Sequence, residues 1–188
     1  MSLATFLENV VEILRELGIP HMLTGSLAAA YYSTPRATQD VDLVIETSED
    51  LLGSLVERLA GAGLYVDASA ALEAYRSWGQ FNAIDPDTGW KVDLILRRSR
   101  AFSAEEFTRR TPGRILGVEV ALTTIEDLII AKLEWAALGD SELQRRDVIA
   151  LLERSQDIAL DRTHIDRWIQ ALGLSKEWDS ILRRMDPP

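Results

Sequence analysis

The chain has 188 residues, 47% hydrophobic and 27% charged, a balance typical of a globular domain and unlike that of disordered or collagen-like chains. Thirty acidic against 20 basic residues give a net charge of −10, which excludes strong non-specific binding to nucleic acids, so any such contact must be local. The absence of cysteine excludes disulfides, thiolate nucleophiles and iron–sulfur or zinc-thiolate sites, and fits a reducing cytoplasm.

The sequence carries no signal for a membrane or for export. No run of about 18 apolar residues occurs, and acidic residues interrupt the apolar pattern of the N-terminal segment. We therefore expect a soluble, cytoplasmic protein.

The first two thirds of the chain alternate helical and extended patterns. Residues 3–17 follow a possible cap at Ser2, show helical spacing of apolar residues and end at Gly18. A strand over 21–24 then leads through a Gly25-Ser26 turn into a second helix, and a loop over 33–39 follows. Further helices are expected from Ser48 to residue 61, over 68–77 and over 103–107, and further strands over 40–46, 64–66, 80–84, 90–96 and 115–122.

From Thr124 onward the apolar period becomes helical throughout. Helices are expected over 124–139, 141–154, 163–172 and 175–184. The sequence therefore predicts an α/β (α+β) core over residues 1–122, with a small mixed, twisted sheet flanked by helices. A C-terminal helical tail over 123–188 is expected to pack on this core.

Two carboxylates mark the strand over 40–46. Asp40 and Asp42 are two residues apart, so their side chains leave the same face, where they form a site for a hard cation. On Asp-x-Asp alone, a half-exposed edge strand with solvated acids is the preferred interpretation, because short motifs match often by chance. Gly25-Ser26, between a strand and a helix, would offer backbone N–H groups and a hydroxyl to a phosphate, although Ser26 could also be an ordinary cap. Asp93 adds a third acid within an apolar strand.

In chain order these segments resemble the nucleotidyltransferase superfamily that includes the polymerase beta-like enzymes. The shared pattern is an apolar strand, Gly25-Ser26, thirteen residues, Asp40-Val41-Asp42 and a later strand-borne Asp93. The resemblance covers about residues 8–97. More narrowly, residues 36–43 (Arg-Ala-Thr-Gln-Asp-Val-Asp-Leu) resemble the minimal bacterial nucleotidyltransferases, which include abortive-infection toxin-type and drug-modifying proteins.

The resemblance implies a metal-dependent transfer of a nucleoside monophosphate from a nucleoside triphosphate to an acceptor hydroxyl, with release of pyrophosphate. Asp40 and Asp42 would hold Mg²⁺ (or Mn²⁺), and Asp93 would help to bind a second metal or activate the acceptor. Gly25 and Ser26 would hold the triphosphate.

Three more residues are assigned to the nucleotide by the same resemblance. Arg36 and Thr38 belong to the quoted motif, and Arg36 would neutralise phosphate charge, although a structural salt bridge explains it equally well. Residues 126–133 and 145–148 resemble a tail in which a lysine, here Lys132, reaches the phosphates; a solvated or snorkelling lysine is an equal alternative. Asp147 is expected to pair with a neighbouring arginine.

The acceptor stays open among a small hydroxyl compound, an RNA end such as that of tRNA, and a protein hydroxyl. The alternative function is a non-catalytic module of the same fold that acts as a toxin–antitoxin partner and binds an antitoxin. A concentration of arginines between residues 97 and 114 could contact a polyanion, but a solvated surface that counterbalances nearby acidic residues is the preferred interpretation.

Overall fold

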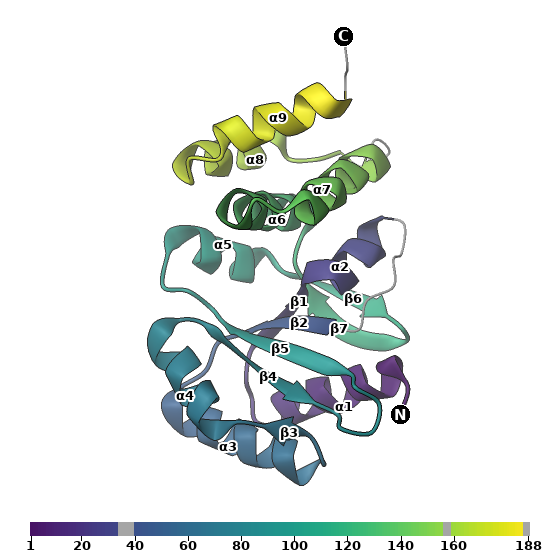
Figure 1. Ribbon diagram of the computed structural model, residues 1–188, viewed down its shortest axis with the longest axis vertical. Helices are drawn as coiled ribbons and strands as arrows, with labels where there is room; N and C mark the ends of the chain where they lie inside the picture. Colours follow the sequence, from purple (N-terminus) through teal and green to yellow (C-terminus); the bar gives the residue numbers. More distant parts are fainter. Residues whose placement is uncertain (34–39, 156–158, 186–188) are drawn as a thin grey trace. The chain divides into compact units, whose positions relative to one another are not determined.

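The computed structural model describes residues 1–33, 40–155 and 159–185 (Figure 1). The predicted loop over 33–39 therefore lies almost entirely outside the described residues. The described chain forms two compact units. The first comprises Met1–Leu27 and residues 40–123, and the second comprises residues 28–33, 124–155 and 159–185. None of the helices in these ranges has the length and apolar character that crossing a bilayer requires.

The first unit is built on a mixed sheet, as the sequence predicted. In the described residues its strand order is β3-β4-β5-β2-β1-β7-β6, with β2 parallel to β5, β1 parallel to β7, and the other neighbours antiparallel. The strands are β1 (His21–Thr24), β2 (Asp40–Ile45), β3 (Tyr65–Val66), β4 (Gln80–Ile84), β5 (Lys91–Leu96), β6 (Thr111–Ile115) and β7 (Val118–Leu122).

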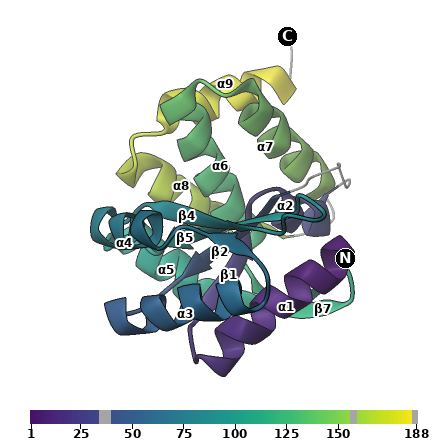
Figure 2. The ribbon, with the colours of Figure 1, turned by 60° about the horizontal axis from the view of Figure 1, so that its bottom comes forward.

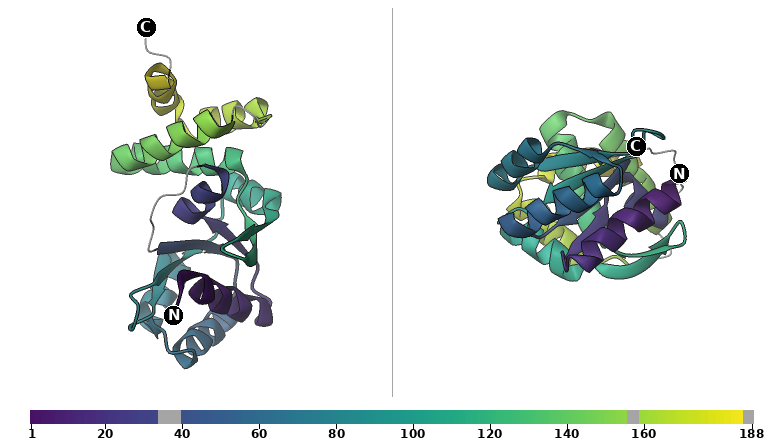
Figure 3. Two further views of the ribbon diagram at one scale, coloured as in Figure 1. Left: turned by 90° about the vertical axis from the view of Figure 1, so that its right-hand side faces the viewer. Right: turned by 90° about the horizontal axis from the view of Figure 1, so that it is seen from below.

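Helices cover one face of this sheet. They are α1 (Leu3–Glu16), α3 (Glu49–Gly61) and α4 (Ala68–Ser77), of which α1 and α3 lie side by side beneath the strands (Figures 2 and 3). The helices bury apolar side chains against alternate residues of β2, where Val41, Leu43 and Ile45 are fully buried. Because strand side chains alternate between faces, Asp40 and Asp42 lie on the opposite face of the sheet.

The predicted caps explain where α1 and α3 begin. The Ser2 hydroxyl accepts a hydrogen bond from the Thr5 N–H, and the Ser48 hydroxyl accepts one from the Leu51 N–H. Each hydroxyl satisfies an N–H group that has no acceptor within its helix. The interpretation of Ser2 and Ser48 as N-caps is confirmed.

One predicted strand is wrong. Residues 115–122 do not form a single strand but part of the hairpin of β6 and β7, which turns at Leu116 and Gly117 with φ values of 52° and 85°. Two successive residues with positive φ are typical of a tight hairpin turn, and leucine at the first of them gives no sequence signal for it. Pro112 and Gly113, expected as a turn, lie within β6, where proline is tolerated because β6 is an edge strand.

The helix after β1 also begins earlier than predicted. Gly25 and Ser26 are the first residues of α2 (Gly25–Tyr32) and do not form a separate turn. Gly25 has a φ of 66°, so the change of direction takes place within a single residue. A residue other than glycine would be strained there.

The second unit is helical, as predicted. Its helices are α6 (Ile125–Gly139), α7 (Glu142–Arg154), α8 (Arg162–Ala171) and α9 (Ser175–Met185), and α6 packs against the other three. The Thr124 hydroxyl caps α6 and also bonds the Asp127 carboxylate, 2.7 Å away. Buried Asp127 lies 2.6 Å from His164 Nε2, which links α6 to α8 through a polar contact inside the unit.

Candidate active site

The three predicted aspartates lie on two neighbouring strands. The parallel pairing of β2 with β5 places Asp42 directly opposite Asp93, and the pairing of β1 with β2 places Thr24 opposite Asp42. Paired residues of adjacent strands point to the same face of the sheet. Asp42 and Asp93 therefore share a face, and Asp40 follows on that face two residues before Asp42.

Gly25 brings the start of α2 against the Asp42 carboxylate. A Cβ atom at Gly25 would lie 1.9 Å from Asp42 Oδ2 and 2.5 Å from its Cγ. Such distances are far inside van der Waals contact, so glycine is required here for space as well as for its positive φ. The partly exposed Ser26 follows immediately. The structure thus brings Gly25, Ser26 and Asp42 together.

Lys91 stands between the other two carboxylates. Its Nζ lies 3.0 Å from Asp93 Oδ2 and 3.5 Å from Asp40 Oδ1. Burial lowers the pKa of Lys91, but the contacts with Asp93 and then Asp40 outweigh burial, so its pKa lies above the usual value and the side chain stays charged. The ammonium group therefore offsets the repulsion between Asp40 and Asp93.

Lys91 is a residue of this cluster that the motifs did not indicate. Its signal is its position two residues before Asp93 on the same strand, which places both side chains on one face. The contact with Asp40 depends on the register of β5 against β2, which no local pattern specifies.

No group of three or more histidine, cysteine, aspartate or glutamate side chains in the described ranges is close enough together to hold a metal ion. Asp40, Asp42 and Asp93 are thus neighbours without forming a closed ligand set, and a protein cation lies between two of them. Carboxylate oxygens are nevertheless the ligands that Mg²⁺ prefers. The contacts of Lys91 show that these carboxylates attract positive charge, and metal binding by them stays a prediction.

The structure does not place the other predicted nucleotide-binding residues relative to this cluster. Arg36 and Thr38 lie outside the described residues. Lys132 belongs to the second unit, where its side chain is 3% exposed and its Nζ lies 2.7 Å from Asp147 Oδ2 and 3.0 Å from Gln144 Oε1. The lysine is therefore neither solvated nor snorkelling. A role for Lys132 in phosphate binding stays a prediction.

Lys132→Met should destabilise the helical unit by about 3 kcal/mol, because Asp147 would lose its buried cationic partner. Urea unfolding followed by circular dichroism measures this. Lys176→Met, at an exposed position of α9, removes the same charge and should change the unfolding free energy by less than about 0.5 kcal/mol. Equal stabilities of the two variants would contradict a structural role for the Lys132–Asp147 pair.

Comparisons with known proteins identify the fold. No family model matches the sequence, and no curated protein matches it. Among solved structures, the antibiotic-resistance factor ANT(2'')-Ia is similar over 96% of this chain and 95% of its own, with a TM-score of 0.59 and 15% identity. An antigenic nucleotidyltransferase-like protein from Paracoccidioides brasiliensis is similar over 96% and 92%, with a TM-score of 0.51 and 18% identity.

A third similar structure is the lincosamide antibiotic adenylyltransferase LnuA, over 80% of this chain and 96% of its own, with a TM-score of 0.52 and 8% identity. The chain therefore has the nucleotidyltransferase fold. The fold expectation drawn from the Gly-Ser and Asp-x-Asp motifs is confirmed.

Proposed function

We propose that this protein is a nucleotidyltransferase that moves a nucleoside monophosphate from a nucleoside triphosphate to an acceptor hydroxyl. The observation that carries the proposal is the alignment of Asp42 opposite Asp93 with Gly25 packed against the Asp42 carboxylate. This arrangement joins acidic side chains to the first turn of a helix on a nucleotidyltransferase fold, so ligands for a cation and donors for a phosphate come from adjacent elements.

Residues of the first unit have separate roles in the proposed reaction. The Ser26 hydroxyl and the N–H groups at the start of α2 bind phosphate oxygens of the donor. The oxygen of the acceptor hydroxyl bonds to the α-phosphorus, the bond from the α-phosphorus to the bridging oxygen breaks, and pyrophosphate leaves. We assign the proton of the hydroxyl to Asp93, because Asp93 shares a face with Asp42.

Asp40 and Asp42, with Asp93, are the residues that would hold Mg²⁺ or Mn²⁺. Such an ion supplies charge stabilisation to the phosphate oxygens and to the leaving pyrophosphate. Lys91 stays charged and lies against Asp40 and Asp93, so it sets the charge of this carboxylate cluster before nucleotide arrives.

Structural neighbours support a small hydroxyl compound as the acceptor. ANT(2'')-Ia has been solved with adenylyl-2''-tobramycin, and LnuA with lincomycin. We propose the same class of acceptor here, with ATP as the first donor to test. The net charge of −10 also favours a small acceptor over a long nucleic acid.

Release of pyrophosphate tests this proposal. The protein is incubated with each nucleoside triphosphate and Mg²⁺, alone and with an aminoglycoside, a lincosamide or tRNA. Release that requires both a nucleotide and a hydroxyl acceptor is the expected result. Tight nucleotide binding without release for any acceptor would instead favour a non-catalytic binding module.

Lys91→Met should raise the affinity for Mg²⁺ by about tenfold, because a positive charge beside Asp40 and Asp93 is removed. Isothermal titration calorimetry on the nucleotide-free protein measures this. The variant should also be less stable than wild type without metal and should gain more stability from Mg²⁺. Lys176→Met is the matched control and should bind Mg²⁺ as wild type does; weaker binding by Lys91→Met would show that the lysine supports the site instead of competing with the ion.

A further inference from the structure

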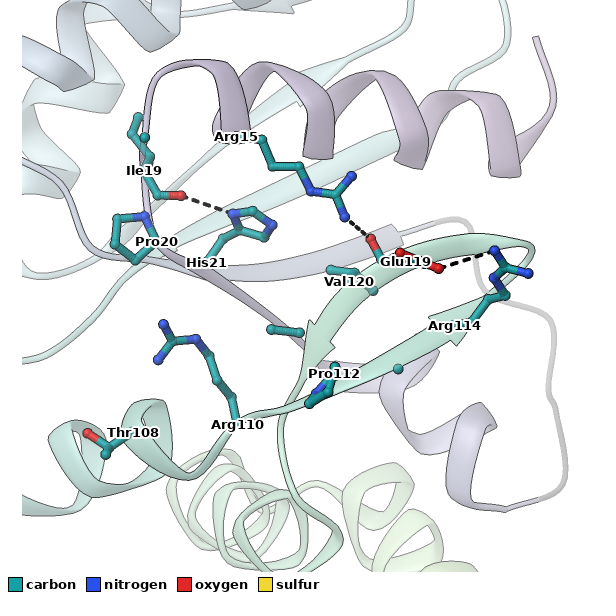
Figure 4. A pocket seen from close by; sticks show the side chains of 13 residues that line it. Arg15, Ile19, Pro20, His21, Thr108, Arg110, Pro112, Arg114, Glu119 and Val120 are labelled. Atoms are coloured by element: carbon teal, nitrogen blue, oxygen red, sulfur yellow. Dashed lines mark hydrogen bonds and ion pairs between the residues drawn. The ribbon is translucent and has the colours of Figure 1, made fainter.

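A second concave site lies in the first unit, at the other end of β1. This groove has a volume of about 1060 Å³. It is lined by the end of α1, the start of β1 with the segment before it, the end of α5 (Ala101–Arg109), and the β6–β7 hairpin (Figure 4). His21, at the start of β1, borders the groove, whereas Gly25 follows the end of the same strand. The two places are about 13 Å apart along the strand. The groove is therefore separate from the aspartate cluster.

The groove is positively charged within an acidic chain. Its lining includes three arginines, Arg15, Arg110 and Arg114, but one carboxylate, that of Glu119, which pairs with Arg114 at 3.2 Å. A local excess of two positive charges contrasts with the net charge of −10 for the whole chain. From the sequence, Arg110 and Arg114 are interpreted as part of a solvated surface. The structure places them in the same groove as Arg15 of α1.

Two of the arginines, Arg15 and Arg110, donate hydrogen bonds to backbone carbonyl oxygens, which carry no net charge. Arg15 Nη2 donates to the backbone carbonyl oxygen of Glu119, and Arg110 Nη1 donates to that of Phe107. The Arg110 guanidinium also lies 4.1 Å from the centre of the Phe107 ring. These contacts fix the direction of each guanidinium without neutralising it, and each uses few of its five N–H donors. Both groups are thus oriented and retain their charge for a ligand.

His21 lies between these cations (Figure 4). Its Nδ1 lies 3.0 Å from the Ile19 carbonyl oxygen, an acceptor, so Nδ1 carries the proton and Nε2 is the nitrogen that can gain one. Burial lowers the pKa of His21 despite that hydrogen bond, and Arg15 and Arg110 lower it further. The negative charge of an anion in the groove would offset the positive charges of the two arginines, and the pKa of His21 would rise again.

We propose that this groove binds a phosphate group of a second ligand, distinct from the nucleotide donor. Guanidinium groups match the oxygens of phosphate in paired hydrogen bonds, and Arg15 and Arg110 line this groove from different elements. The volume is too large for a lone ion and suits a phosphate ester with an organic part against Pro20 and Pro112, or a short stretch of polynucleotide. A phosphate ester and a polynucleotide would both present a phosphate group to the arginines.

Nuclear magnetic resonance of the two histidines tests the site. The imidazole signals of His21 and His164 are followed during titration with inorganic phosphate, and separately with a single-stranded RNA oligomer, in EDTA at constant ionic strength. Saturable movement of the His21 signals is expected, and His164 is the reference because it is buried against Asp127 in the other unit. RNA saturating at far lower concentration than phosphate would identify a polynucleotide, whereas comparable saturation would identify a small phosphate compound.

Variants separate a specific site from general ionic effects. Arg15→Ala and Arg110→Ala should each weaken binding by about tenfold or more, whereas Arg76→Ala, at an exposed position of α4, should not change it. Asp42→Asn should also leave the titration unchanged, which makes the result independent of the proposed donor site. No movement of His21 below about 10 mM of either probe, or equal movement in the arginine variants, would overturn the proposal.

Discussion

Asp42→Asn is expected to lower the rate of pyrophosphate release by about 10³-fold or more while leaving the protein folded. Asparagine keeps the size of the side chain but removes the negative charge opposite Asp93 and beside the first turn of α2. The unfolding free energy should change little or rise, because one of several clustered like charges is removed. The same pyrophosphate assay, with the acceptor that wild type uses, measures the effect.

Asp87→Asn is the matched control for this change. Asp87 is an exposed carboxylate in the β4–β5 turn, outside the cluster, and its loss should not alter turnover. If Asp42→Asn kept more than about a tenth of the wild-type rate, Asp42 would not be part of the catalytic site.

Gly25→Ala is expected to impair both stability and turnover. The added methyl group would overlap the Asp42 carboxylate, and alanine at a φ of 66° is strained. We expect a loss of about 1 kcal/mol for the backbone and a further 1–3 kcal/mol for the overlap. Displacement of Asp42 should reduce turnover by about 10²-fold. Urea unfolding and pyrophosphate release measure the two effects.

Gly63→Ala is the control that distinguishes backbone strain from steric overlap with Asp42. Gly63 has a φ of 86°, but nothing lies within 4 Å of the place where its Cβ would be. This variant should lose about 1 kcal/mol and keep wild-type turnover. Equal behaviour of Gly63→Ala and Gly25→Ala would mean that the close approach of Gly25 to Asp42 has no functional role.

Local sequence patterns were sufficient for most of the elements. Ser2 and Ser48 mark helix starts, and the alternation of Asp40 and Asp42 with apolar residues defines both the strand and the face that carries the acids. These features depend on neighbouring residues alone, so they can be read before the fold is known. The hairpin at Leu116 could not, because a leucine with positive φ is stabilised by its surroundings and not by its own preference.

The remaining features depend on long-range pairing. The parallel register of β5 against β2 brings Lys91 to Asp40 and Asp93. The buried pair of Lys132 and Asp147 arises from the packing of α6 against α7, and the groove from the approach of Arg15 on α1 to the β6–β7 hairpin. No periodicity or motif specifies these contacts.

Nucleotide binding tests the central claim most directly. The affinity of wild type for each of the four nucleoside triphosphates is measured by calorimetry with and without Mg²⁺, and compared with Asp40→Ala and with Asp87→Asn. We expect Mg²⁺-dependent binding of at least one nucleotide, lost in Asp40→Ala and kept in Asp87→Asn. Absence of binding to all four by correctly folded protein, or binding that neither Mg²⁺ nor Asp40 affects, would contradict the assignment of this face of the sheet as a nucleotide donor site.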